Sequence, residues 1–137
     1  PAAPDTFARS KLDWGERAGR GEWLALHADL LGARKTDPAF GTGVRVDGAV
    51  LGPAAFVLRY FVPGGDDRLL VVNLGRDLRA DPVPEPLLAP PDGAAEWAPR
   101  WSSEAPAYGG HGTAPLDTAD GWLIPGEAAV WLAGARA

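Results

Sequence analysis

Aspartate and glutamate are the side chains of this sequence best suited to acid–base chemistry, and it contains 18 of them. Cleavage of a glycosidic bond by two carboxyl groups requires that they face each other about 5–9 Å apart. Asp66 and Asp67 lie together in a predicted hairpin loop, where we expect water to solvate both. Asp117 and Asp120 lie in another loop. None of these carboxylates follows a predicted parallel strand, so the sequence contains no recognisable catalytic pair.

The two histidines do not form a metal site or a nucleophile motif. His27 lies on the apolar face of a predicted helix, which favours a packing or hydrogen-bonding role, and His111 is expected to be exposed in a glycine-rich loop. There is no cysteine, and two isolated histidines do not make a zinc site. The loop at 109–112 lacks the lysine and hydroxyl residue of a phosphate-binding loop, and no Gly-x-Ser-x-Gly motif occurs. We therefore assign no catalytic residue, metal ligand or cofactor.

Tryptophan offers a different kind of site, because aromatic faces stack on sugar rings, and the chain has six. An exposed row would form a carbohydrate platform, made of Trp14, Trp97, Trp101 or Trp122. Tryptophan is mostly buried in proteins, so a core or interface position is favoured for Trp23, Trp97 and Trp131. Trp14 stands in an irregular segment, which makes it the clearest candidate for ligand contact.

Length and composition limit the fold. A chain of 137 residues with 46% hydrophobic residues forms one compact domain, or a domain with a short appendage. It is too short for a (β/α)8 barrel of roughly 250 residues. The 18 glycines and 14 prolines predict many turns. There is no methionine, so we expect the chain to be a processed product or a piece of a longer protein.

Charge and hydropathy exclude two classes of partner. The net charge is −5, and the excess of acidic residues lies after residue 41. A phosphate backbone or an anionic membrane surface requires a basic face, and no apolar run approaches the roughly 18 residues of a membrane span. We expect neither nucleic acid nor membrane as a partner.

One amphipathic helix is predicted over 22–35. Apolar spacing at i, i+3, i+4, i+7 and i+8 gives one stripe, made of Trp23, Leu26, His27, Leu30 and Leu31. Pro38 ends the helix, because the residue before a proline avoids helical geometry. This stripe must pack against another element.

From Gly43 the apolar period changes to two, which indicates strands. Residues 55–62 and 68–74 predict a hairpin, whose second strand is covered on both faces and therefore central. Asp47–Gly48 is a turn signal. A strand over 96–102 is expected to carry Trp97 and Trp101 on the same face.

Proline-rich residues 80–93 predict an edge or polyproline segment, and 121–124 and 127–133 predict the last strands. The expected fold is mainly β, an antiparallel β-sandwich preceded by one helix.

Several segments resemble malto-oligosyltrehalose trehalohydrolases, which are α-amylase-family glycoside hydrolases. Residues 6–14, Thr-Phe-Ala-Arg-Ser-Lys-Leu-Asp-Trp, resemble the segment that leads into the last barrel helix of that family. Within it, Ser-Lys-Leu-Asp-Trp is the most specific part, since glycogen branching enzymes share only a looser Leu-Asp-Trp. The resemblance covers essentially the whole chain and continues over 24–31, 34–40, 101–104, 108–110 and 122–130.

This resemblance implies a (β/α)8 barrel followed by a small β-sandwich. Residues 1–41 would be a lead-in loop and the last barrel helix, and 42–137 the C-terminal antiparallel β-sandwich. The family cleaves the α-1,4 bond next to the trehalose end of a maltooligosyl trehalose and releases trehalose. Its Asp, Glu and Asp catalytic residues lie upstream of this chain, so the chain alone is expected to be inactive.

The resemblance also implies a maltooligosaccharide-type substrate, packing on the missing barrel and a cytoplasmic location. Lys11, Asp13 and Trp14 would follow the last barrel strand, on the side where barrel active sites form. They are therefore candidate substrate contacts, with the alternative that Trp14 wedges between barrel and helix. An independent carbohydrate-binding β-sandwich and the tail of a glycogen branching enzyme remain alternative functions.

Overall fold

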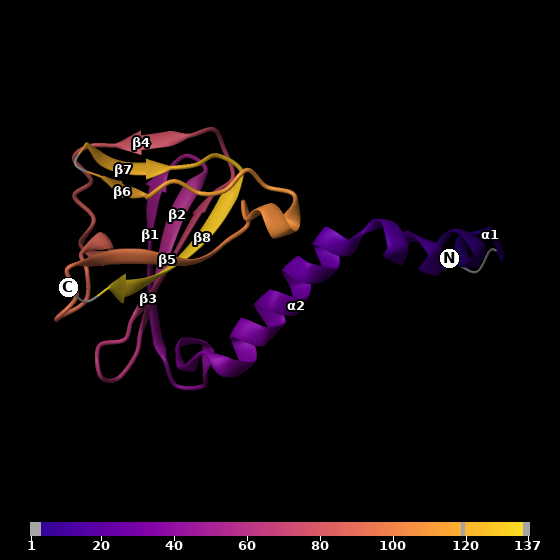
Figure 1. Ribbon diagram of the computed structural model, residues 1–137, viewed down its shortest axis with the longest axis horizontal. Coiled ribbons are helices and arrows are strands. Elements are labelled where there is room, and N and C mark those ends of the chain that lie inside the picture. The colour runs from indigo at the N-terminus through magenta and orange to yellow at the C-terminus, as the bar shows by residue number, and fades with distance from the viewer. Residues whose placement is uncertain (1–3, 119, 136–137) are drawn as a thin grey trace.

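The computed structural model describes residues 4–118 and 120–135 and is mainly β, as predicted. Two antiparallel sheets face each other (Figure 1). The larger sheet has the order β1 (Arg45–Gly52), β2 (Ala55–Phe61), β3 (Arg68–Asn73), β8 (Ala128–Ala135) and β5 (Glu96–Ser102). The smaller sheet has the order β4 (Leu78–Ala80), β7 (Gly121–Ile124) and β6 (Asp117–Thr118). The predicted hairpin is β2–β3, and β3 lies at the centre of the larger sheet.

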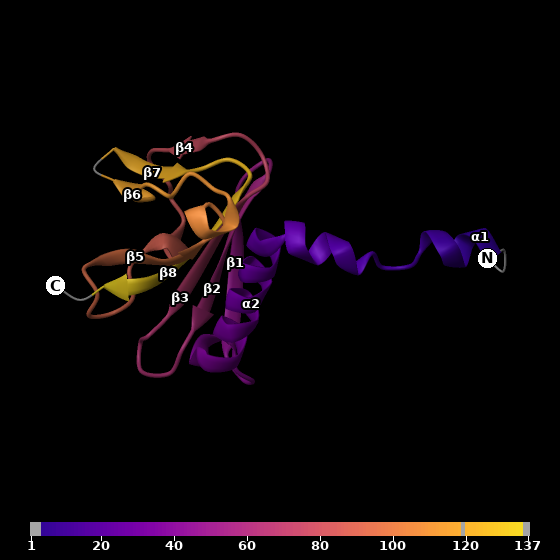
Figure 2. The same cartoon turned by 45° about the vertical axis from the view of Figure 1, so that its right-hand side comes forward.

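Helical segments precede the sheets: α1 (Pro4–Arg9), the 3-10 helix η1 (Trp14–Gly19), α2 (Gly21–Thr36) and the 3-10 helix η2 (Pro38–Phe40). The helix predicted over 22–35 is α2. It ends before Pro38, where Asp37 is extended and accepts a hydrogen bond from the Ala39 backbone N–H. Both views show α1 at the end of the molecule far from the sheets (Figures 1 and 2). The lead-in therefore contributes nothing to the core of the sandwich.

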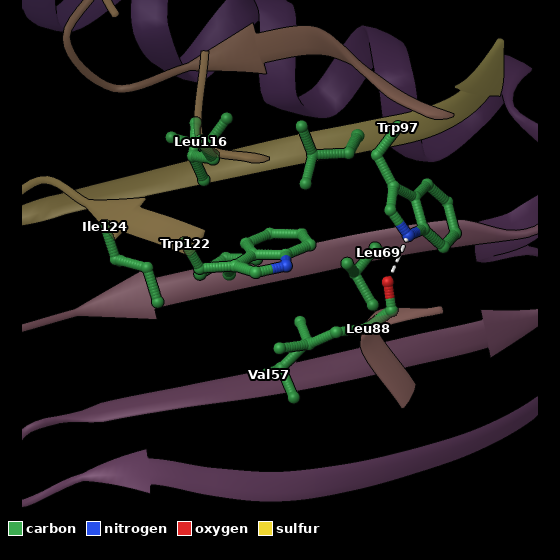
Figure 3. Close-up of a cluster of buried hydrophobic side chains, with 10 residues drawn as sticks. Val57, Leu69, Leu88, Trp97, Leu116, Trp122 and Ile124 are labelled. Carbon is green, nitrogen blue, oxygen red and sulfur yellow. Dashed lines mark hydrogen bonds between the residues drawn. The ribbon is translucent and has the colours of Figure 1, made fainter. Parts of the chain in front are cut away.

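The hydrophobic core lies between the two sheets (Figure 3). Alternate residues of β2, β3 and β8 point into it, as the two-residue period requires. Its members include Val57, Leu69, Trp97, Trp122 and Ile124. The indole N–H of Trp97 donates to the backbone oxygen of Leu88, at 2.8 Å, in the 3-10 helix η3 (Pro86–Leu88). The proline-rich segment is thereby tied to the core without becoming a central strand.

The predicted turn at Asp47–Gly48 is wrong. Both residues lie inside β1, which pairs in register with β2, and the turn follows at 53–54. A Cβ on Gly48 would lie 2.7 Å from the side chain of Leu58 across the ladder. Glycine is needed at position 48 because the two strands approach closely there, and not because the chain turns.

The prediction that Trp97 and Trp101 share a face is also wrong. The pairing of β5 with β8 shifts register between Pro99 and Trp101. An extra residue in one strand reverses the facing of every residue after it. Trp97 is therefore in the core, whereas Trp101 lies opposite Trp131 on the outward face of the larger sheet.

The prediction that water solvates Asp67 is wrong, because its carboxylate is buried in an ion pair with Arg59, which in turn ties the hairpin to η3. The Arg59 guanidinium contacts the Asp67 carboxylate at 2.9 Å, with both side chains about nine-tenths buried. Arg59 also donates to the backbone oxygens of Leu87 and Ala89, and Asp67 accepts from the Val62 backbone N–H. Each charge is thus hydrogen-bonded on more than one side, which is the condition for tolerating burial.

We expect Asp67→Ala to lower the free energy of unfolding by about 3–5 kcal/mol, because it leaves the Arg59 charge buried without a carboxylate. Asp47→Ala is the matched control, since Asp47 and Arg45 are exposed and 4.0 Å apart, and it should cost less than about 1 kcal/mol. Urea unfolding of the two variants measures both values. Equal losses would contradict a structural role for the buried pair.

Candidate functional site

An open groove of about 520 Å³ lies between the lead-in and the first half of α2. Asp13 caps the start of η1 by accepting a hydrogen bond from the Gly15 backbone N–H at 2.8 Å. The lining residues are Leu12, Asp13, Trp14, Glu16, Arg17, Arg20, Trp23, Leu24 and His27. Two indoles and several charged groups are thus brought to one surface.

The three candidate substrate contacts have different surroundings. Trp14 is 75% exposed and lines the groove. Asp13 also lines it, but one of its carboxylate oxygens is already used as the helix cap. Lys11 is not among the lining residues, and its ammonium group lies over the ring of Phe7 at 5.1 Å. The structure therefore brings Asp13 and Trp14 together and places Lys11 outside the groove.

Trp23 is a groove residue that the sequence did not identify. The apolar period favoured a core or interface position, yet the side chain is 58% exposed and lines the groove with Trp14. Gly15, Gly19 and Gly21 interrupt the helical pattern between the two tryptophans, but no periodicity of the sequence pairs Trp14 with Trp23. Such an arrangement can bind a ring face and hydroxyl groups. In the described residues, no group of three or more acidic or histidine side chains is placed to hold a metal ion.

The carbohydrate platform predicted from four tryptophans does not exist as a continuous row. Trp97 and Trp122 are buried in the core, at 5% and 8% exposure, and Trp101 is half-buried. Trp14 is the member that is well exposed. His27 is exposed and bonds the Trp23 carbonyl of its own helix through Nδ1, and His111 is exposed in its loop.

Exposed apolar side chains occur along the lead-in and α2, and we call this set the N-terminal apolar surface. It consists of exposed side chains from the lead-in and α2: Phe7, Leu12, Trp14, Trp23, Leu24, Leu30 and Leu31. No residue of α2 is buried. Only Ala25, Leu26 and Ala33 of the helix are half-buried. Most of the predicted apolar stripe is therefore uncovered. Apolar areas of this kind mark sites of protein contact.

Polar contacts hold α2 to the sandwich at two places. The Tyr108 hydroxyl, in the 3-10 helix η4 (Pro106–Tyr108), donates to the Asp29 carboxylate at 2.5 Å and accepts from the Trp101 indole N–H at 3.0 Å. At the other end, Asp37 pairs with Arg68 at 2.9 Å. Tyr108 and Asp29 are 79 positions apart in the sequence, so no local sequence pattern could predict their contact.

Apolar packing reinforces the second attachment. Phe40 packs edge-on against the rings of Tyr60 and Trp131, with centroid distances of 5.1 and 4.8 Å. Ala39 beside it is buried. This end of α2 is therefore joined to the sheet by a half-buried aromatic contact, which positions the helix and the groove beyond it.

Comparison with known proteins identifies a family and a relative. Residues 45–131 match the family described as "Domain of unknown function (DUF3459)". A protein named malto-oligosyltrehalose trehalohydrolase, from Deinococcus radiodurans, is 39% identical over 88 residues. That alignment covers 58% of this chain and 14% of the relative, so the chain corresponds to a small part of that protein. No solved structure matches. No helix in the described part of the chain has the length and apolarity that crossing a membrane requires.

The Tyr108–Asp29 contact makes a titration prediction. The hydrogen bond to the Asp29 carboxylate raises the pKa of Tyr108 above its ordinary value of about 10, because only the protonated phenol can donate. The contact is therefore complete below pH 10 and is lost as pH rises through the raised pKa. We expect Asp29→Asn to lower the pKa of Tyr108, measured by tyrosinate absorbance.

The chain has two tyrosines, so Tyr108→Phe identifies the signal. Asp37→Asn is the control, since Asp37 contacts Arg68 and not Tyr108. If both aspartate variants shift the titration equally, or neither does, the assignment of the raised pKa to Asp29 is wrong.

Proposed function

Because the chain belongs to the DUF3459 family, which forms the C-terminal domain of α-amylase-family enzymes, we propose that it is the C-terminal, non-catalytic portion of a glycoside hydrolase. The proposed reaction is hydrolysis of the α-1,4 bond next to trehalose in a maltooligosyl trehalose. The Deinococcus relative and the Ser-Lys-Leu-Asp-Trp segment at 10–14 support this specificity. The parent enzyme then acts in trehalose formation in the cytoplasm.

The observation that carries the proposal is the N-terminal apolar surface. It lies entirely on residues that precede the matched region, and the sandwich leaves it uncovered. Exposed Trp23, Leu24 and Leu31 would be buried if α2 were the last helix of a catalytic barrel. In this proposal residues 1–41 belong to the barrel and 42–137 form the sandwich, and the catalytic Asp, Glu and Asp lie on the barrel.

Substrate contact is proposed for Lys11, Asp13 and Trp14. Trp14 would stack on a sugar ring, the free oxygen of Asp13 would accept from a hydroxyl, and Lys11 would donate to one. The exposure of Trp14 and its position beside Asp13 in the groove support these roles. The competing role for Trp14 is a wedge between barrel and α2, in which the same exposed ring is buried by protein.

A second candidate is an independent carbohydrate-binding module, which the exposed Trp14 and Trp23 in one groove favour. Maltoheptaose titrated into the 137-residue chain separates the two. A saturating change in tryptophan fluorescence favours the carbohydrate-binding module, and the absence of any change excludes that function. A variant of the first proposal is that the chain is the tail of a glycogen branching enzyme. The substrate loops of the upstream barrel would distinguish a branching enzyme from a trehalohydrolase.

We expect the 137-residue chain to release no trehalose from maltotriosyl trehalose, because it carries no catalytic carboxylate pair. The product of the reading frame extended upstream of residue 1 should release it.

The chain alone should also bind an apolar fluorescent dye, which the extended enzyme should not. The double variant Trp23→Ser with Leu31→Ser should reduce dye binding. The control Leu74→Ser changes an exposed residue of the sandwich and should leave dye binding unchanged. An upstream frame that encodes no barrel would contradict the proposal.

In the extended enzyme, we expect Trp14→Ala to raise KM about tenfold, which corresponds to the ~1.4 kcal/mol of one aromatic stacking contact. Trp14→Phe is the control, because it keeps an aromatic face. The measurement is steady-state release of trehalose with thermal unfolding in parallel. Unchanged KM with a lower unfolding temperature would assign Trp14 to the wedge role instead.

A further inference from the structure

In the described part of the chain, the strands at the edges of the two sheets differ in how well they are protected against pairing with a further strand. A sheet edge carries unpaired backbone N–H and C=O groups, and proteins protect it with short strands, prolines or irregular register. In the smaller sheet, the edge strands β4 and β6 have three and two residues. In the larger sheet, the edge strand β5 contains Pro99 and shifts its register beside it. These three edges offer little to a further strand.

The edge strand β1 lacks these protections. It has eight residues, and its register with β2 is regular from residue 45 to residue 50. This stretch contains neither proline nor lysine. Residues 45–48 are exposed in succession, so both faces of the strand are accessible there. Val46 is 47% and Val50 80% exposed. A long exposed edge that carries apolar side chains is a site where another strand can add to the sheet.

The charges of β1 favour a second copy of the same chain as the source of that strand. Arg45 and Asp47 have opposite charges and lie on the same face, one on each side of Val46 along the strand. In an antiparallel pair centred on Val46, Arg45 of each copy lies opposite Asp47 of the other, so both cross-strand pairs are complementary. Within one chain the two groups are exposed and 4.0 Å apart. Such an exposed pair is weak and does not prevent this exchange of partners.

We propose that two copies of the chain join their larger sheets through antiparallel pairing of β1, with Val46 at the two-fold axis. The exposed backbone supplies the hydrogen bonds, and two pairs of Arg45 with Asp47 fix the register. Val46 lines the cavity at Trp131 between α2 and the sheet, so its side chains meet on the outward face. Two-fold symmetry is the commonest symmetry of homodimers, and this strand is complementary to itself. The interface is separate from the groove at Trp14 and does not depend on the function proposed for the parent enzyme.

The first test uses the absence of cysteine from the chain. With Val46→Cys, two thiols would lie opposite each other at the axis, and oxidised glutathione should convert most of the 137-residue chain into a disulfide-linked dimer. Val50→Cys is the matched control. Position 50 is the more exposed of the two, at 80% against 47%, but it does not lie opposite itself in this register. We expect it to cross-link at least tenfold more slowly.

Sedimentation equilibrium of the 137-residue chain, at concentrations up to about 1 mM, measures the dimer without a cross-link. Asp47→Arg brings like charges opposite each other and should weaken dimerisation at least tenfold. Asp92→Arg makes the same change of charge at an exposed position outside β1, and it should change the affinity less than threefold. Arg45→Asp combined with Asp47→Arg exchanges the two charges and should restore dimerisation.

The proposal is overturned if Val50→Cys cross-links as fast as Val46→Cys, or if the chain stays monomeric at about 1 mM. Association that is lost on Trp23→Ser with Leu31→Ser, but not on Asp47→Arg, would assign the contact to the N-terminal apolar surface instead. Cross-linking of the 137-residue chain but not of the extended enzyme would mean that an upstream segment occupies β1, which also overturns the proposal. Val46 and Asp47 are exposed, so neither single variant removes a core side chain.

Discussion

The larger sheet is apolar on both faces, and the smaller sheet covers only one of them. On β3, Leu69 and Val71 point into the core and are fully buried, while Leu70 and Val72 point outward and are half-buried. A two-sided apolar sheet requires a second covering layer. The segment of α2 and η2 supplies part of that layer, and this explains why the helix lies where it does.

The covering of the outward face by α2 is incomplete. Phe40 and the Arg68–Asp37 pair hold one end of α2 against the sheet, yet the helix has no buried residue. Its remaining apolar side chains face away from the sandwich or toward the cavity at Trp131. The described residues therefore form a β-sandwich whose N-terminal helix keeps exposed apolar side chains.

Much of the fold was predictable because it depends on local periodicity. The alternation in 55–62 and 68–74 identified a hairpin with a central strand, and Pro38 identified the end of α2. The errors have physical causes. The face of the sheet on which Trp101 lies depends on a register shift after Pro99. The two-residue periodicity of the sequence does not reveal such a shift. At Gly48 the glycine serves a close approach to Leu58, which sequence cannot distinguish from a turn.

The sequence by itself determined the class of fold, the helix, the absence of a recognisable catalytic pair and the resemblance carried by Ser-Lys-Leu-Asp-Trp. These follow from residue type and local spacing. Only the tertiary structure decided which side chains share a site. Trp14 and Trp23 come together at the groove, Tyr108 reaches Asp29, and Arg59 pairs with Asp67 inside the core. These contacts depend on how helices and strands are arranged in space, and the spacing of residues along the chain does not determine that arrangement.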